Sequence, residues 1–204
     1  MSAFSPTGTD NSNLGGKLAL RRHILDQAGF ESLRVLDLFA GEGHIWGRLK
    51  KEYKVATYLP CDRERRQPAL LLGDSPRLLR GLVVSRFNVI DVDCYGDPWE
   101  CWLHIAPRIE GRTAVFLTCG ISSSGSCMGT SVTNWTKKLC GIPLAWDVPR
   151  KWELAVYAAG FAFRAGCQET NVLAAGKIHS GNVDYYGLLC EGKSDAIGSA
   201  TRAG

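Results

Sequence analysis

Residues Arg34 to Leu49 decide the fold, and they read Arg-Val-Leu-Asp-Leu-Phe-Ala-Gly-Glu-Gly-His-Ile-Trp-Gly-Arg-Leu. The first half is a short apolar run that contains one acid, Asp37, and closes on a turn with Gly41 and Gly43. Apolar residues then recur at helical spacing as far as Leu49. This order predicts a buried strand, a tight glycine turn and a helix. In an open α/β sheet, the crevice beyond the carboxyl end of such a strand is where nucleotide-like ligands bind.

The residues around the turn distinguish between two kinds of ligand. The dinucleotide fingerprint requires a third glycine for close helix packing, and Trp46 stands at that position, which disfavours a nicotinamide dinucleotide. Asp37 lies two residues before the turn, and a carboxylate there suits a cationic ligand such as the ammonium group of a methionine moiety. An ordinary strand-to-helix turn with a solvated Asp37 remains the alternative.

The string Asp-Leu-Phe-Ala-Gly-x-Gly, which begins at Asp37, resembles motif I of the class I S-adenosylmethionine-dependent methyltransferases. The resemblance implies a Rossmann-like α/β fold: a mostly parallel seven-stranded sheet with a terminal antiparallel hairpin and helices on both faces. It also implies S-adenosyl-L-methionine as the cofactor. By matched position, the cofactor-binding residues of this stretch would be Asp37, Phe39, Ala40, Gly41 and Gly43.

Composition limits the class of protein. The 204 residues are 45% hydrophobic and 22% charged, which is typical of a globular domain, and the net charge of +4 permits a nucleic-acid partner. No apolar run is long enough to cross a membrane, so we expect a cytoplasmic protein with no membrane partner. The eight cysteines have no metal-ligand spacing, so we expect no metal site and mostly buried, reduced thiols. We expect one domain over residues 17–191, between flexible segments 1–16 and 192–204.

An acid follows the predicted second strand, Val55 to Leu59. A carboxylate at the end of that strand can accept hydrogen bonds from both ribose hydroxyls, so Asp62 is the candidate ribose ligand, with Arg63 beside it. The alternative is that Asp62 caps a short helix over residues 63–67.

A second acid follows the predicted third strand, Ala69 to Leu72. Ser75 is predicted to cap the next helix, because Pro76 suits the first helical position. In the methyltransferases that this chain resembles, an acid at this turn accepts a hydrogen bond from the adenine amino group. The resemblance therefore implies cofactor contacts at Asp74 and Ser75, although an acid here also favours the helix dipole.

The predicted fourth strand, Phe87 to Val92, leads into Asp-Val-Asp-Cys-Tyr-Gly-Asp-Pro, which begins at Asp91. A capping box explains the last Asp-Pro of this string but not Asp91, Asp93 or Tyr95. A carboxylate that accepts an N–H hydrogen from an exocyclic amine concentrates electron density on the nitrogen and stabilises its developing positive charge. These residues are therefore candidates for methyl transfer to an amino nitrogen.

The same string resembles motif IV of the tRNA guanine exocyclic-amine dimethyltransferases, Asp-x-Asp-Pro-Phe/Tyr-Gly-Ser-Pro, with Cys94 in place of the first proline and Asp97 in place of the serine. By matched position, Asp93 would be the catalytic acceptor with Tyr95 beside it, and Asp91 would hold the active-site turn or the cofactor. That family carries an additional tRNA-binding domain, which we do not expect here. We therefore expect an RNA or DNA substrate, with a partner subunit as one route to recognition. The alternative is a non-catalytic scaffold subunit, which Cys94 favours.

The remaining elements complete the predicted sheet. In the helix predicted from Lys17 to Ala28, Lys17, Arg21 and Arg22 lie off the apolar face and are expected to be solvated, with contact of Arg21 and Arg22 to phosphate as the alternative. The other predictions are a fifth strand over 113–118, a lid-like loop over 119–133, a helix over 149–159, and a terminal hairpin of strands over 167–173 and 183–190.

Overall fold

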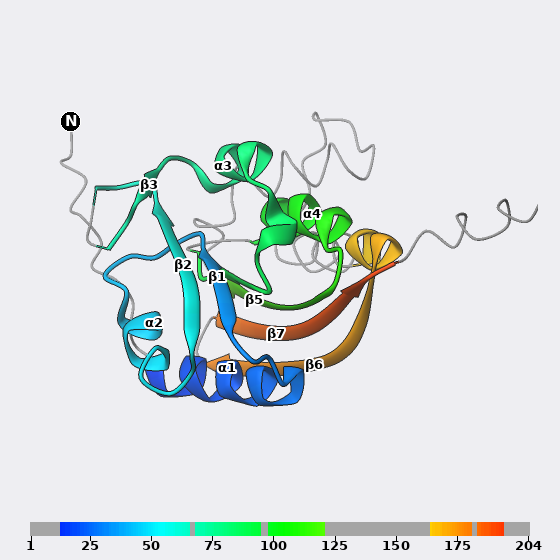
Figure 1. Cartoon of the computed structure of the whole chain (residues 1–204), viewed down its shortest axis with the longest axis horizontal. Helices are drawn as coiled ribbons and strands as arrows, with labels where there is room; N and C mark the ends of the chain where they lie inside the picture. Colours follow the sequence, from blue (N-terminus) through cyan, green and yellow to red (C-terminus); the bar gives the residue numbers. More distant parts are fainter. Residues whose placement is uncertain (1–12, 66–67, 95–97, 121–163, 181–182, 194–204) are drawn as a thin grey trace, which may run out of the picture.

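The structure is a computed structural model, and it describes residues 13–65, 68–94, 98–120, 164–180 and 183–193. A twisted sheet runs through this part of the chain, with helices on both faces (Figure 1). The predicted helix over 149–159, most of the predicted lid and Tyr95 lie outside the described residues.

Seven strands form the sheet, in the order β3-β2-β1-β4-β5-β7-β6. The strands β1 to β5 pair in parallel, and β7 lies antiparallel between β5 and β6. The bounds are β1 (Leu33–Asp37), β2 (Val55–Asp62), β3 (Leu71–Leu72), β4 (Val89–Val92), β5 (Arg112–Gly120), β6 (Thr170–Ser180) and β7 (Val183–Gly192). The predicted fold, a mostly parallel seven-stranded sheet that ends in an antiparallel hairpin, is confirmed.

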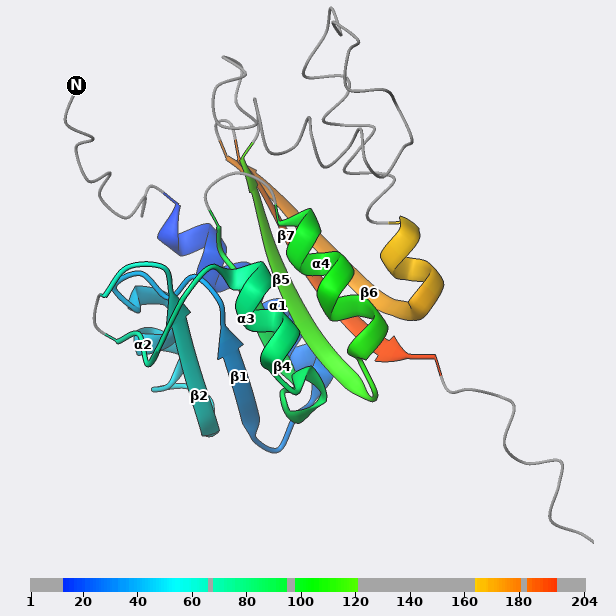
Figure 2. The same ribbon diagram turned by 90° about the horizontal axis from the view of Figure 1, so that it is seen from above.

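Two helical layers cover the sheet. The layers can be followed in Figures 1 and 2, with α1 and α2 on one face and α3 and α4 on the other. Each layer has its own core: Trp46 is buried in the first and Trp102 in the second. The bounds are α1 (Leu14–Ala28), α2 (His44–Leu49), α3 (Ser75–Gly81) and α4 (Trp99–Ile105), with single turns η1 (Val84–Arg86) and η2 (Ala106–Arg108).

Helix α1 lies unusually close to the terminal hairpin. Gly176 of β6 and Gly187 of β7 are register partners under the helix. A Cβ atom at Gly187 would lie 2.8 Å from Ile24, and one at Gly176 would lie 2.9 Å from Leu20. Two paired glycines therefore let α1 pack directly on the strand backbones, which fixes its height above the sheet.

Several predicted boundaries were wrong. Helix α1 begins at Leu14 rather than Lys17. Residues 164–169 are helical, so the strand predicted from Cys167 instead begins at Thr170 and continues to Ser180, through residues predicted as a connection. Ser75 is the first helical residue rather than the cap. The strand over Ala174 to Ser180 is rich in small and polar residues, and its pairing with β7 outweighs that low strand propensity.

The larger correction concerns α1, where Lys17 and Arg21 were predicted to be solvated. Both side chains are buried, whereas Arg22 is exposed and pairs with Glu52. The reason is that Asp91 of β4 and Asp93, just beyond the end of β4, pair with the two cations, as described below.

Other predictions concern cysteines and membranes. Of the six cysteines in the described residues, five are buried, as expected, and none is in a disulfide. The same residues contain no cluster of three or more side chains able to hold a metal ion. Among them, no helix has the length and apolar character needed to cross a membrane.

Candidate active site

One cavity lies at the carboxyl ends of the parallel strands, with a volume of about 270 Å³. It brings together every predicted site residue that the structure describes. These are Asp37, Phe39, Ala40, Gly41, Gly43, Asp62, Arg63, Asp74, Ser75, Asp91 and Asp93. Lys17, Thr118 and Tyr185, which the sequence analysis missed, also line the cavity.

The glycine turn after β1 forms one wall of the cavity. Gly41 and Gly43 have φ angles of 52° and 72°, in the left-handed region that favours glycine. The N–H of Ala40 donates to the Cys61 carbonyl over 2.9 Å, and the N–H of Gly41 donates to Asp62 over 2.8 Å. The turn is therefore held against the end of β2, and α2 begins directly after it.

Asp37 ends β1 and is buried in an acid-rich environment. The Tyr58 hydroxyl donates to its Oδ2 over 2.9 Å. Burial, and then the nearby charge of Asp91, raise the pKa of the Asp37 carboxyl well above its usual range, although the bond from Tyr58 opposes this. A cation placed against Asp37 would favour its ionised form, as expected for a residue that binds an ammonium group.

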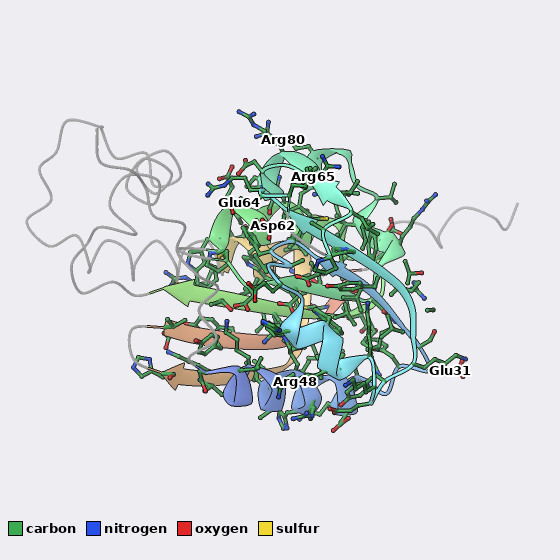
Figure 3. All side chains as sticks on the ribbon, turned by 90° about the vertical axis from the view of Figure 1, so that its left-hand side faces the viewer. Glu31, Arg48, Asp62, Glu64, Arg65 and Arg80 are labelled. Atoms are coloured by element: carbon green, nitrogen blue, oxygen red, sulfur yellow. The ribbon has the colours of Figure 1, made fainter. Side chains whose placement is uncertain are left out.

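Asp62 ends β2, and both of its carboxylate oxygens accept backbone hydrogen bonds. Gly41 donates to Oδ2 and Glu64 donates to Oδ1 over 2.9 Å. Figure 3 shows Asp62 and Glu64 beside each other where β2 ends. Residues 63–65 are not helical, and positions 66–67 lie outside the described residues. Each oxygen can accept a second hydrogen bond, so these contacts orient the carboxylate without using up its acceptor capacity.

Asp74 and Ser75 lie at the start of α3. The Asp74 side chain makes no capping hydrogen bond to the helix. The Ser75 hydroxyl is buried and donates to the Leu38 carbonyl over 2.7 Å, which ties α3 to the glycine turn. Capping therefore does not explain why an acid occupies position 74.

Asp91 of β4 is surrounded by donors. Arg21 of α1 donates to Oδ2 over 2.8 Å and to Oδ1 over 2.6 Å. The indole N–H of Trp46 donates to Oδ2 over 2.8 Å. The side chains of Arg21 and Asp91 are only 2% and 1% exposed, so this carboxylate joins α1, α2 and β4 inside the protein. Trp46 stands where the dinucleotide fingerprint has its third glycine, and here it helps to hold the Asp91 carboxylate.

Asp93 lies just beyond the end of β4 and is held from two sides. The Thr118 hydroxyl of β5 donates to Oδ1 over 2.6 Å, and the Lys17 ammonium of α1 donates to Oδ2 over 2.8 Å. The neighbouring Cys94 thiol donates to the Thr118 carbonyl over 3.3 Å. The Lys17 ammonium is also 5.4 Å from the centre of the Tyr185 ring. These contacts place the carboxylate in the cavity wall in a defined orientation.

Among known proteins, the chain is similar to solved structures but matches no family model or curated sequence. The structure of Trm1 from Pyrococcus horikoshii, solved with S-adenosyl-L-methionine, matches 94% of this chain at 14% identity with a TM-score of 0.63.

The fold is that of the Rossmann-like methyltransferases. This chain spans 58% of the length of that Trm1 structure. The PH0226 protein from Pyrococcus horikoshii OT3 also matches, at 14% identity and a TM-score of 0.52, over 93% of this chain and 96% of its own. The structural similarity and the strand order establish this fold, and at 14% identity the roles of individual residues must be argued from the cavity itself.

Proposed function

We propose that this chain is an S-adenosylmethionine-dependent methyltransferase that methylates an exocyclic amino nitrogen of RNA or DNA. One observation carries the proposal: Asp37, Asp62, Asp74 and Asp93 lie at or just beyond the ends of four strands and line one cavity beside the glycine turn. Parallel strands bring their carboxyl ends to the same edge of a sheet, so the convergence of acids there marks a ligand site.

The cavity residues fit the proposed cofactor chemically. S-Adenosylmethionine presents an ammonium group, ribose hydroxyls and an adenine amino group, all of which donate hydrogen bonds, and carboxylates accept them. We assign Asp37 to the ammonium group, Asp62 to the ribose and Asp74 to the adenine. Phe39, Ala40, Gly41, Gly43, Arg63 and Ser75 complete the cofactor-binding surface. The similarity in fold to Trm1, which was solved with S-adenosyl-L-methionine, supports the choice of cofactor.

The chemistry requires alignment more than acid–base groups. The bound cofactor supplies an electrophilic methyl group on a sulfonium. Transfer of this methyl group would form a nitrogen–carbon bond, break the carbon–sulfur bond with a neutral thioether as the leaving group, and develop positive charge on the acceptor nitrogen. The Asp93 carboxylate would accept an N–H hydrogen bond from that nitrogen, stabilise the charge and then take the proton that the nitrogen loses. Tyr95, the other residue that the sequence predicts beside the acceptor, lies outside the described residues.

The acceptor class rests on the motif IV resemblance and on the basic net charge of +4. The proteins that carry that motif select tRNA with an additional domain. We therefore include a partner subunit for substrate recognition in the proposal, and leave tRNA, other RNA and DNA as acceptors for the experiment to separate.

Two observations favour a second function, a non-catalytic scaffold subunit with the same fold. Both oxygens of Asp93 already accept hydrogen bonds within the protein, from Thr118 and Lys17. Cys94 also replaces the proline of the motif. A carboxylate used only for internal contacts would need no ligand.

The test is transfer of a labelled methyl group from S-adenosylmethionine to total tRNA, ribosomal RNA and genomic DNA, with wild-type protein and Asp93→Asn. We expect label on one polymer and a loss of about 10²-fold or more in the variant, because the anionic acceptor is gone. Equal transfer by Asp93→Asn would contradict the assignment of Asp93. Binding of S-adenosylhomocysteine without transfer to any polymer would favour the scaffold.

A further inference from the structure

Helix α1 and strand β4 carry a matched pair of charges. Lys17 and Arg21 are four residues apart on the helix, a rise of about 6 Å. Asp91 of β4 and Asp93, just beyond the end of that strand, are two residues apart, a rise of about 6.6 Å for extended backbone. Because the two spacings agree, both ion pairs form together: Lys17 with Asp93 over 2.8 Å and Arg21 with Asp91 over 2.6 Å.

We infer that Lys17 and Thr118 are positioning residues, which hold the Asp93 carboxylate in the orientation and charge that methyl transfer needs. The inference rests on the proposed function and adds residues from α1 and β5 to its site. It gives α1, which precedes the glycine turn in the chain, a part in the reaction.

The geometry around Asp93 indicates that Thr118 and Lys17 orient its carboxylate and do not block it from a ligand. One donor meets each carboxylate oxygen, and the two donors come from different elements, so they restrict rotation of the side chain. A carboxylate oxygen has two lone pairs, and each oxygen therefore keeps one acceptor position. The side chain of Asp93 is 14% exposed and lines the cavity, so it remains accessible to a ligand there.

The charges explain why a cation is needed. Asp37, Asp91 and Asp93 all line the same cavity. Arg21 balances Asp91 through two hydrogen bonds, and the Lys17 side chain, only 9% exposed, balances Asp93. A largely buried carboxylate without its cation costs free energy, so removal of Lys17 would leave Asp93 uncompensated beside other acids.

Helix α1 does not depend on Lys17 for its place in the fold. Arg21 fixes the helix to β4, and Leu20 and Ile24 pack on the paired glycines of β6 and β7. Replacement of Lys17 should therefore alter the site without detaching the helix.

The experiment measures steady-state methyl transfer from S-adenosylmethionine to total tRNA. We expect Lys17→Met and Thr118→Val each to lower kcat by about tenfold or more, because each removes a hydrogen bond to a charged group. The KM for S-adenosylmethionine should not change. Thr118→Ser keeps the hydroxyl and should restore most of the rate lost in Thr118→Val, which a loss of packing alone would not allow.

A double-mutant cycle gives the deciding control. If Lys17 and Thr118 act through Asp93, neither substitution lowers kcat further when Asp93→Asn is already present. The same loss in the Asp93→Asn background would overturn the inference. Weaker binding of S-adenosylhomocysteine by Lys17→Met would also overturn it, by making Lys17 a cofactor ligand. A wild-type protein that transfers no methyl group to tRNA, ribosomal RNA or DNA would instead overturn the proposed function itself.

Discussion

The guanidinium of Arg21 donates two hydrogen bonds to Asp91, and both side chains are buried. The carboxylate also accepts the indole N–H of Trp46, so a single acid connects the first helix, the glycine-turn helix and the central strand. Removal of one partner from such a pair leaves a charge without compensation inside the protein, which is costly.

We predict that Arg21→Met lowers the free energy of unfolding by about 3–5 kcal/mol, because Asp91 stays buried without its cation. Arg22→Met is the matched control. Arg22 is the next residue on the same helix and pairs with Glu52 at the surface, so its loss should change stability little. Urea denaturation of the two variants and the wild type measures both. Similar losses in the two variants would contradict the structural role of Arg21.

Asp37 makes stability depend on pH. Its pKa in the folded protein is raised well above the ordinary 3.8, so the native state binds this proton more tightly than the unfolded chain does. The free energy of unfolding of the wild type therefore falls as pH rises from about 4 through the raised native pKa. Asp37→Asn removes this contribution.

The expected result is that the stability of Asp37→Asn relative to wild type increases with pH across that range and is constant above it. Urea denaturation of both proteins at a series of pH values gives the difference directly. A difference that is independent of pH would show that Asp37 titrates normally in the folded protein.

The sequence predicted the acids of the cavity but not their partners. Asp37, Asp62, Asp74 and Asp93 lie at or just beyond strand ends, and a strand end is recognisable from a local pattern. Their roles toward a ligand remain predictions. Lys17 and Arg21 were assigned to solvent because their acids lie 76 and 70 residues away in the chain, and helical periodicity carries no information about such partners. The signal available in the sequence for these ion pairs was a match of spacings. Lys17 and Arg21 are four residues apart in a helix, and Asp91 and Asp93 are two residues apart in extended chain, so the two pairs span similar distances.

Helix α1 and the β6–β7 hairpin depend on each other through backbone contact. Gly187 has no room for a side chain, because a Cβ atom there would lie 2.8 Å from Ile24 and 3.1 Å from Leu20. Both neighbours are buried, so a larger residue would push the helix away from the sheet and stretch the ion pairs of Lys17 and Arg21.

We predict that Gly187→Ala lowers the free energy of unfolding by about 1–3 kcal/mol through overpacking. Gly47 is the control, because it lies in helix α2 with open space around its Cβ position. Gly47→Ala should leave stability unchanged or raise it by up to about 1 kcal/mol. Thermal denaturation, monitored by circular dichroism, measures the stability of both variants. A neutral Gly187→Ala would mean that α1 tolerates a shift.

Strand β6 shows what local patterns cannot predict. Its small and polar residues have low strand propensity, and its structure comes from pairing with β7 along almost its entire length. Strands β1, β4 and β5 are buried on both faces and apolar, so they were located correctly to within a few residues.

The described residues combine a methyltransferase fold with a cavity at the carboxyl edge of the sheet. The central claim is that this cavity binds S-adenosylmethionine. Substitution of Asp62 tests this claim most directly, because its carboxylate contacts the glycine turn and is assigned to the ribose.

The most direct measurement is calorimetric titration of the protein with S-adenosylhomocysteine, repeated on Asp62→Ala and on Asp26→Ala. Asp26 is the control, an exposed acid of α1 that bonds Tyr53 and does not line the cavity. We predict micromolar binding by the wild type and by Asp26→Ala, and binding weaker by about 1–3 kcal/mol for Asp62→Ala, since the ribose hydroxyls lose their acceptor. Absence of binding by the wild type, or preference for a nicotinamide dinucleotide, would contradict the account.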